Sequence, residues 1–79
     1  MLRLEYERRR KGLTQEQLAH LSGAAFTTIN RIERGHTVPT ERTLVRLTKA
    51  LRLPASARES LLVQVSPDSG TVANLVYSR

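Results

Sequence analysis

Three glycines divide the first half of the sequence into short segments with helical character. Gly12, Gly23 and Gly35 each close one such segment, and glycine is favoured just beyond the C-terminal end of a helix. Helices this short gain most of their stability by packing an apolar face against other elements. The fold class that follows is all-α, a compact bundle of four to five helices.

Helix-start signals set the boundaries of the first three helices. The first is expected over residues 2–11 and the third over residues 25–34. Between them, Thr14 opens the second helix, because Thr14 and Gln17 have the spacing of a capping box. Each of the three helices then ends at one of the glycines.

Two further helices are expected in the second half of the chain. Thr40 caps the fourth, and Pro54 marks the break that follows it. Ser56 and Glu59 have the spacing of a second capping box and open the fifth. The apolar stripe of the fourth helix comprises Leu44, Leu47 and Leu51. That of the fifth comprises Ala57, Leu61 and Val65.

The C-terminal tail differs in character from the helical part. Residues 66–70 are rich in turn-forming residues, which divides the chain into a domain of residues 1–65 and a tail of residues 66–79. The tail carries four sizeable apolar side chains, namely Val72, Leu75, Val76 and Tyr77. A short β-strand is one conformation that this pattern allows.

The charge of the chain favours a polyanionic partner. Thirteen Lys and Arg residues, most of them arginine, oppose seven Asp and Glu residues, and the net charge is +6. Arginine forms bidentate hydrogen bonds with phosphate and with guanine. A soluble protein that is merely basic is the plainer reading of the same charge.

Several other classes of protein are disfavoured. The chain has no cysteine, which excludes disulfides and thiolate metal sites. His20 and His36 have no further ligands at metal-binding spacing, and no catalytic constellation stands out, so we expect neither an enzyme nor a cofactor. The apolar run of residues 61–63 is too short to span a membrane, and residues 1–5 do not resemble a signal peptide. A cytoplasmic protein is expected.

The segment from Leu13 to Gly35 carries the functional information. It predicts two short helices joined by a tight turn at Gly23. Ala19 is small enough to let the second helix cross closely. The apolar residues expected to lock the two helices together are Leu18, Ile29 and Ile32.

The solvent side of the later helix in this pair is expected to be a binding face. It presents Phe26, Thr27, Asn30 and Arg31, and Gln15 lies near the start of the preceding helix. An exposed helix that carries Thr, Asn and Arg suits the major groove of DNA.

This segment resembles the Cro/repressor-type helix-turn-helix family. The residues that carry the resemblance are Leu13-Thr14-Gln15, Leu18-Ala19, Gly23 and Ile29 through Gly35, and the similarity covers about residues 4–53. The resemblance implies a bundle of four or five helices. It also implies a dimer on a two-fold-related site, with the second helix of the motif in the major groove of double-stranded DNA.

The resemblance also assigns roles to individual residues. Gln15 corresponds to a phosphate contact, and Arg31 to a residue that reaches base edges or phosphate. The start of the recognition helix corresponds to Ala25, Phe26, Thr27 and Thr28. Contacts to the flanking DNA backbone correspond to Asn30, Arg34 and His36. Arg8 and Glu33 correspond to a buried ion pair; the alternative for Arg8 is a solvated basic run over residues 8–11.

Three residues depart from the family's pattern. Ala25 stands where Ser or Thr usually caps the recognition helix, which loses about 1 kcal/mol. Phe26 stands where a polar residue is usual; it could contact a thymine methyl group, pack on a neighbouring helix or mark a protein-binding surface. Glu7 stands where an apolar residue is common and leaves the first helix with a thin core face. Thr28 could point inward instead of toward DNA.

The function expected is that of a sequence-specific DNA-binding regulator, a repressor that acts as a homodimer. A phage repressor, a restriction–modification controller and an antitoxin with a toxin partner are all compatible with the sequence. A protein-interaction module on the same fold is the rival from another class. The expected dimer surface is the tail, through Val72, Leu75, Val76 and Tyr77. The competing surface is the fifth helix, through Leu61, Leu62 and Val65, and the two could act together. The alternative for the tail is that it folds back near Tyr6.

Overall fold

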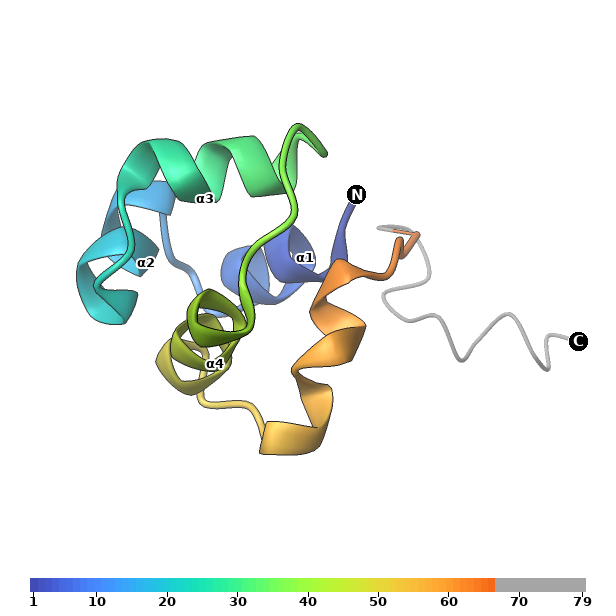
Figure 1. Ribbon diagram of the computed structural model, residues 1–79. Helices are drawn as coiled ribbons and strands as arrows, with labels where there is room; N and C mark the ends of the chain where they lie inside the picture. The colour runs from blue at the N-terminus through green and yellow to red at the C-terminus, as the bar shows by residue number, and fades with distance from the viewer. Residues whose placement is uncertain (67–79) are drawn as a thin grey trace, which may run out of the picture.

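The computed structural model describes residues 1–66, and these form an all-helical bundle (Figure 1). Its four α-helices are α1 (Arg3–Arg10), α2 (Gln15–Ser22), α3 (Phe26–Glu33) and α4 (Glu41–Ala50). Two 3-10 helices follow, η1 (Ala55–Ala57) and η2 (Glu59–Leu62). The predicted fold class is confirmed, and no helix within residues 1–66 is long and apolar enough to cross a membrane.

Local signals in the sequence determine where α2 begins. The Thr14 hydroxyl accepts a hydrogen bond from the Gln17 backbone N–H at 3.0 Å, and the Gln17 side chain accepts one from the Thr14 N–H at 2.8 Å. The predicted capping box is therefore present. Thr40 caps α4 in the predicted way, because its hydroxyl accepts a hydrogen bond from the Thr43 N–H at 3.2 Å.

The core lies where the helices meet, and it draws on every element. Leu4, Leu18, Ile29 and Leu47 have no exposed surface, and each comes from a different α-helix. Leu61 from η2 is equally buried. This single contiguous core fixes the positions of α2 and α3 relative to each other.

The prediction of a fifth α-helix that begins at Ser56 is wrong. The Ser56 side chain makes no helix cap; instead η1 and η2 form, separated by Arg58. The chain then becomes extended at Val63 and pairs in antiparallel fashion with the N-terminus. The Arg3 N–H donates to the Val63 carbonyl and the Val65 N–H to the Met1 carbonyl, both at 2.8 Å.

This pairing explains why the helix stops. The two backbone hydrogen bonds need residues 63–65 to be extended, so a helix that continued through Val65 could not form them. Figure 1 shows the N-terminus beside the end of this segment. The predicted stripe is nonetheless buried, since Ala57 is 7%, Leu61 0% and Val65 7% exposed.

The burial of these residues bears on the expected dimer contacts. Leu61 and Val65 are buried in the core of their own chain, so their side chains have little or no surface left for a partner. Leu62 is partly exposed. The remaining tail residues expected at a dimer interface lie outside the described residues, as does the expected strand: Val72, Leu75, Val76 and Tyr77.

Glu7 on α1 is buried, with 4% of its surface exposed. The guanidinium of Arg3 donates to Glu7 Oε2 at 3.1 Å and also to the Ser60 hydroxyl at 2.7 Å. Arg10 Nε lies 3.4 Å from Glu7 Oε1, a charge contact without hydrogen-bond geometry. Glu7, which was expected to leave α1 with few apolar contacts, is thus paired with two arginines. One of them, Arg3, also links α1 to η2 through Ser60.

Candidate nucleic-acid interface

The turn between α2 and α3 fixes the angle of the helix pair. Gly23 ends α2 with a φ of +78°, a left-handed conformation that glycine adopts without strain. A Cβ added there would meet only Arg46 Nη1 at 4.0 Å, so the requirement for glycine is conformational and not steric. Ala19 is 9% exposed, and Leu18, Ile29 and Ile32 are fully buried in the same core cluster.

The outer face of α3 is exposed and lacks acidic side chains. Phe26 is 45% exposed, and Ala25, Thr27 and Arg31 are also exposed. Glu33 is the acidic residue of α3, and its side chain is only 3% exposed. The face therefore offers an aromatic ring, a hydroxyl and a guanidinium to a partner, with no carboxylate to repel phosphate.

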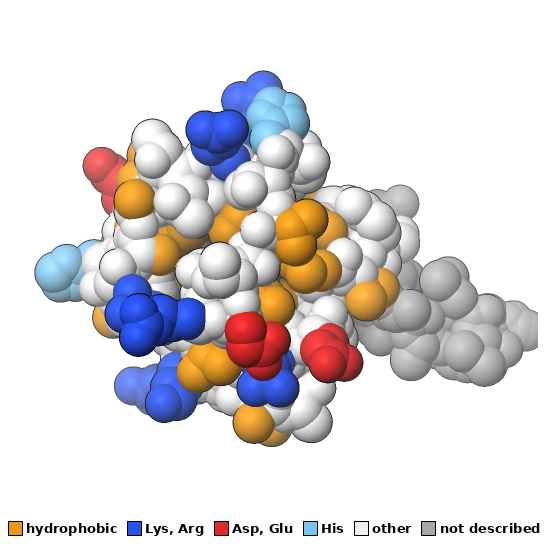
Figure 2. Space-filling model, viewed as in Figure 1, with side chains coloured by type: hydrophobic (Ala, Val, Ile, Leu, Met, Phe, Trp, Pro, Cys, Tyr) orange, Lys and Arg blue, Asp and Glu red, His pale blue; other side chains and the backbone are white. Residues whose placement is uncertain are grey.

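Basic residues continue beyond the end of α3. Figure 2 shows Lys or Arg side chains and a histidine gathered at the upper edge of the molecule, where Figure 1 places the C-terminal end of α3. Arg31, Arg34 and His36 are the exposed basic residues of this segment. Thr28 and Asn30 are partly buried and lie at the sides of the exposed face.

A buried ion pair anchors the C-terminal end of α3 to the rest of the fold. Arg8 Nε and Nη2 donate to the two carboxylate oxygens of Glu33 at 2.7 and 3.0 Å, and Arg8 Nη1 donates to the Leu13 carbonyl at 2.8 Å. The two side chains are 9% and 3% exposed. The structure thus contains the pair that the family resemblance implies, in the bidentate geometry that favours arginine over lysine.

Gln15 extends this ion pair toward the exposed face. Its amide Nε2 donates to Glu33 Oε1 at 2.9 Å, and its Oε1 accepts from Asn30 Nδ2 at 3.1 Å. Sequence analysis identified Gln15 and Asn30 as separate candidate residues. Their hydrogen bond depends on how α2 and α3 cross, so no local sequence pattern predicts it. Both amides are partly buried and held in one orientation.

The start of α3 has no comparable support. Ala25 occupies the N-cap position with φ −72° and ψ 147°, and no side chain accepts a hydrogen bond from the first turn. The sequence predicted this missing cap. The residues that would enter a major groove are therefore held by the backbone and by Ile29, without hydrogen bonds of their own side chains.

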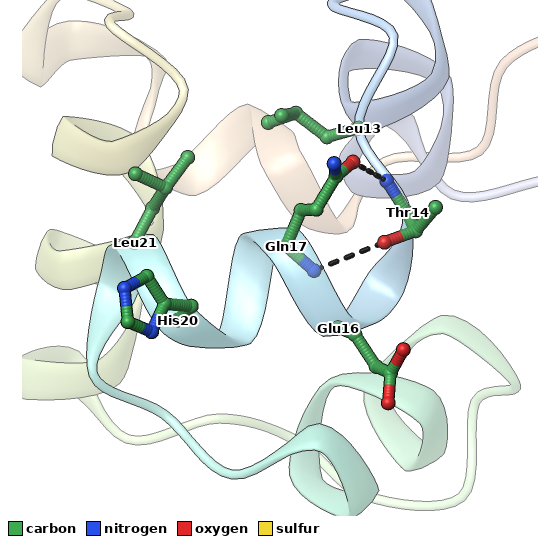
Figure 3. Close-up of a pocket in the computed structure, with 6 residues that line it drawn as sticks. All are labelled: Leu13, Thr14, Glu16, Gln17, His20 and Leu21. Carbon is green, nitrogen blue, oxygen red and sulfur yellow. Dashed lines mark hydrogen bonds between the residues drawn. The ribbon is translucent and has the colours of Figure 1, made fainter.

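A shallow depression lies on α2, apart from these residues. It has a volume of about 570 Å³ and is lined by Leu13, Thr14, Glu16, Gln17, His20 and Leu21 (Figure 3). The dashed lines of Figure 3 mark the capping box, in which Thr14 Oγ1 and Gln17 Oε1 each accept a hydrogen bond from a backbone N–H. Within residues 1–66 no three metal-ligating side chains come together.

The fold and this geometry define a helix-turn-helix protein. A family model described as helix-turn-helix matches residues 4–57, which is more than half of the chain, and the protein belongs to this family in its Cro/repressor type. No curated protein and no solved structure gives a significant match. Family membership places the protein among DNA-binding transcription regulators.

Proposed function

We propose that this protein represses transcription by binding a palindromic operator as a homodimer in the cytoplasm. The observation that carries the proposal is the outer face of α3. Phe26, Thr27 and Arg31 are exposed there beside further basic residues, and the acidic side chain of α3 is buried in an ion pair. A helix with this surface can enter the major groove without repelling the DNA backbone.

Each candidate residue has a role in this proposal. The first turn of α3 reads base edges, and it comprises Ala25, Phe26, Thr27 and Thr28. Arg31 reaches base edges or phosphate from the next turn. The backbone contacts come from Gln15, Asn30, Arg34 and His36. Phosphate contacts supply most of the affinity and base contacts supply the specificity.

In vitro selection from randomised duplex DNA tests the proposal. We expect an enriched inverted repeat whose half-sites lie one helical turn or a multiple apart. The logarithm of the binding constant should fall with the logarithm of salt concentration, with a slope of roughly −4 to −8 for a dimer that neutralises several phosphates per protomer. A slope near zero, or no enrichment over random duplex, contradicts the proposal.

The dimer is supported by apolar surface near the end of the described chain. Leu62 is partly exposed and Val63 is 43% exposed. We propose that these residues and the apolar tail residues Val72, Leu75, Val76 and Tyr77 contact a second copy. Truncation after Asp68 should shift the protein to monomer at micromolar concentration in sedimentation, and should weaken operator binding. A truncated chain that remains a dimer of unchanged strength excludes the tail as the interface and leaves Leu62 and Val63 as the proposed surface.

A protein-interaction module on the same fold, such as an antitoxin that binds a toxin, is the second candidate. The exposed aromatic ring of Phe26 favours it, because aromatic side chains are enriched at protein interfaces. Retention on random duplex at low salt distinguishes the two functions. A DNA-binding protein is retained and is released by salt, whereas a module that has lost DNA binding passes through.

A further inference from the structure

The first turn of α3 is poor in groups that can form hydrogen bonds with bases. Ala25 and Phe26 carry no side-chain donor or acceptor, and Thr27 and Thr28 carry one hydroxyl each. The amides of Gln15 and Asn30 are hydrogen-bonded to each other. A first turn of this composition cannot form the bidentate amide or guanidinium pairs by which proteins usually distinguish bases.

Phe26 is the aromatic side chain of this turn, and it is exposed. It is the single phenylalanine of the chain, and 45% of its surface is exposed although it is strongly apolar. Helical spacing places Phe26, Asn30 and Glu33 on one flank of α3. Because Asn30 and Glu33 are both tied to Gln15, this flank has a fixed orientation, and Phe26 is its exposed end.

We infer that Phe26 selects thymine in the operator by apolar contact with the 5-methyl group. This inference rests on the proposed function, in which the first turn of α3 lies in the major groove. The thymine methyl is the apolar feature that a major-groove base edge presents. A ring without donors or acceptors forms no hydrogen bonds with the other base edges, so each half-site should contain one or two thymines that are read through their methyl groups.

Replacement of thymine by deoxyuracil in the selected operator tests this directly, because it removes only the methyl group. For the wild-type protein, we expect deoxyuracil at one or two positions per half-site to weaken binding by about fourfold per methyl group. For Phe26→Ala, the same replacement should have a clearly smaller effect at the positions that Phe26 reads. Phe26→Leu should keep part of the methyl discrimination, since leucine retains an apolar contact.

Leu21→Ala is the matched control. Leu21 is 57% exposed and apolar but lies on α2, so its loss should leave the sensitivity to deoxyuracil unchanged. Since Phe26 is partly exposed, Phe26→Ala should fold, and its melting temperature and its affinity for random duplex check this. Equal deoxyuracil effects in wild type and Phe26→Ala, or no sensitive position, overturn the inference while the proposed function stands. Failure to select any duplex overturns both.

Discussion

The two ends of α3 are built in opposite ways. At its C-terminal end, Glu33 and Asn30 are held by hydrogen bonds from Arg8 and to Gln15, and the charges are almost fully buried. At its N-terminal end, Ala25 makes no cap and Phe26 is exposed. One end fixes the position of the helix in the fold, and the other end has no side-chain cap and leaves an aromatic ring exposed.

This contrast explains how a domain with a small core can present a binding face. The scaffold positions α3 through Ile29, Ile32 and the ion pair, none of which a ligand needs to touch. The exposed turn can then vary in sequence with little effect on the fold. Under the proposed function, stability and specificity depend on different ends of the same eight-residue helix.

The largest expected effect comes from breaking the anchored end. Glu33→Gln or Arg8→Met leaves the other charge buried without its partner, and each should lower the free energy of unfolding by about 3–5 kcal/mol. Arg9→Met is the matched control, because Arg9 also forms an ion pair, with Glu5, but its side chain is 62% exposed. Exposed pairs contribute about 0–1 kcal/mol. Urea denaturation measures all three, and equal stabilities would show that the pair does not anchor α3.

Substitutions at the exposed face should act on DNA affinity instead. Thr27→Ala and Arg31→Ala should each weaken binding to the selected operator by about 1–3 kcal/mol and leave thermal stability close to wild type. Their effect on random duplex should be smaller, because base contacts carry the specificity. Gln15→Ala should weaken both duplexes, since the DNA contact proposed for Gln15 is to phosphate. Equal losses on both duplexes for Thr27→Ala and Arg31→Ala would place the reading face elsewhere.

The sequence predicted those features that depend on a few neighbouring residues. Thr14 and Gln17 form their capping box, and Gly23 ends α2, because both signals act within one turn of helix. The Ser56 signal has the same form and failed. There, backbone pairing with residues 1–3 requires an extended chain, and this long-range contact outweighs the local preference.

Polar contacts between helices were the other features that local patterns could not predict. Glu7 is held by Arg3, which also contacts Ser60 on a distant part of the chain. The hydrogen bond from Asn30 to Gln15 depends likewise on how α2 and α3 cross. The Arg8–Glu33 pair was expected because of the family resemblance, and charge spacing alone would not have distinguished Arg8 from Arg9 or Arg10.

A smaller effect is expected from the cap of the neighbouring helix. Thr14→Ala removes the hydroxyl that accepts the Gln17 N–H and should lower the free energy of unfolding by about 1 kcal/mol. Thr37→Ala is the control, since Thr37 is an exposed residue of the loop between α3 and α4 and caps no helix. If both variants lose the same stability in urea denaturation, the hydroxyl of Thr14 does not act as a cap.

The smallest expected effect is a gain at the uncapped end of α3. The backbone of Ala25 has φ −72° and ψ 147°, close to the values of −72° and 165° at the Thr40 cap. A threonine at position 25 could therefore cap α3 without a change of backbone conformation. Ala25→Thr should raise the free energy of unfolding by about 0.5–1 kcal/mol. Ala25→Val has nearly the same shape and no hydroxyl, so it should give no gain. Equal stabilities of Ala25→Thr and Ala25→Val would contradict this prediction. Water would then satisfy the backbone donors in the first turn of α3 at no cost. The two ends of the helix would differ less in stability than their hydrogen bonds indicate.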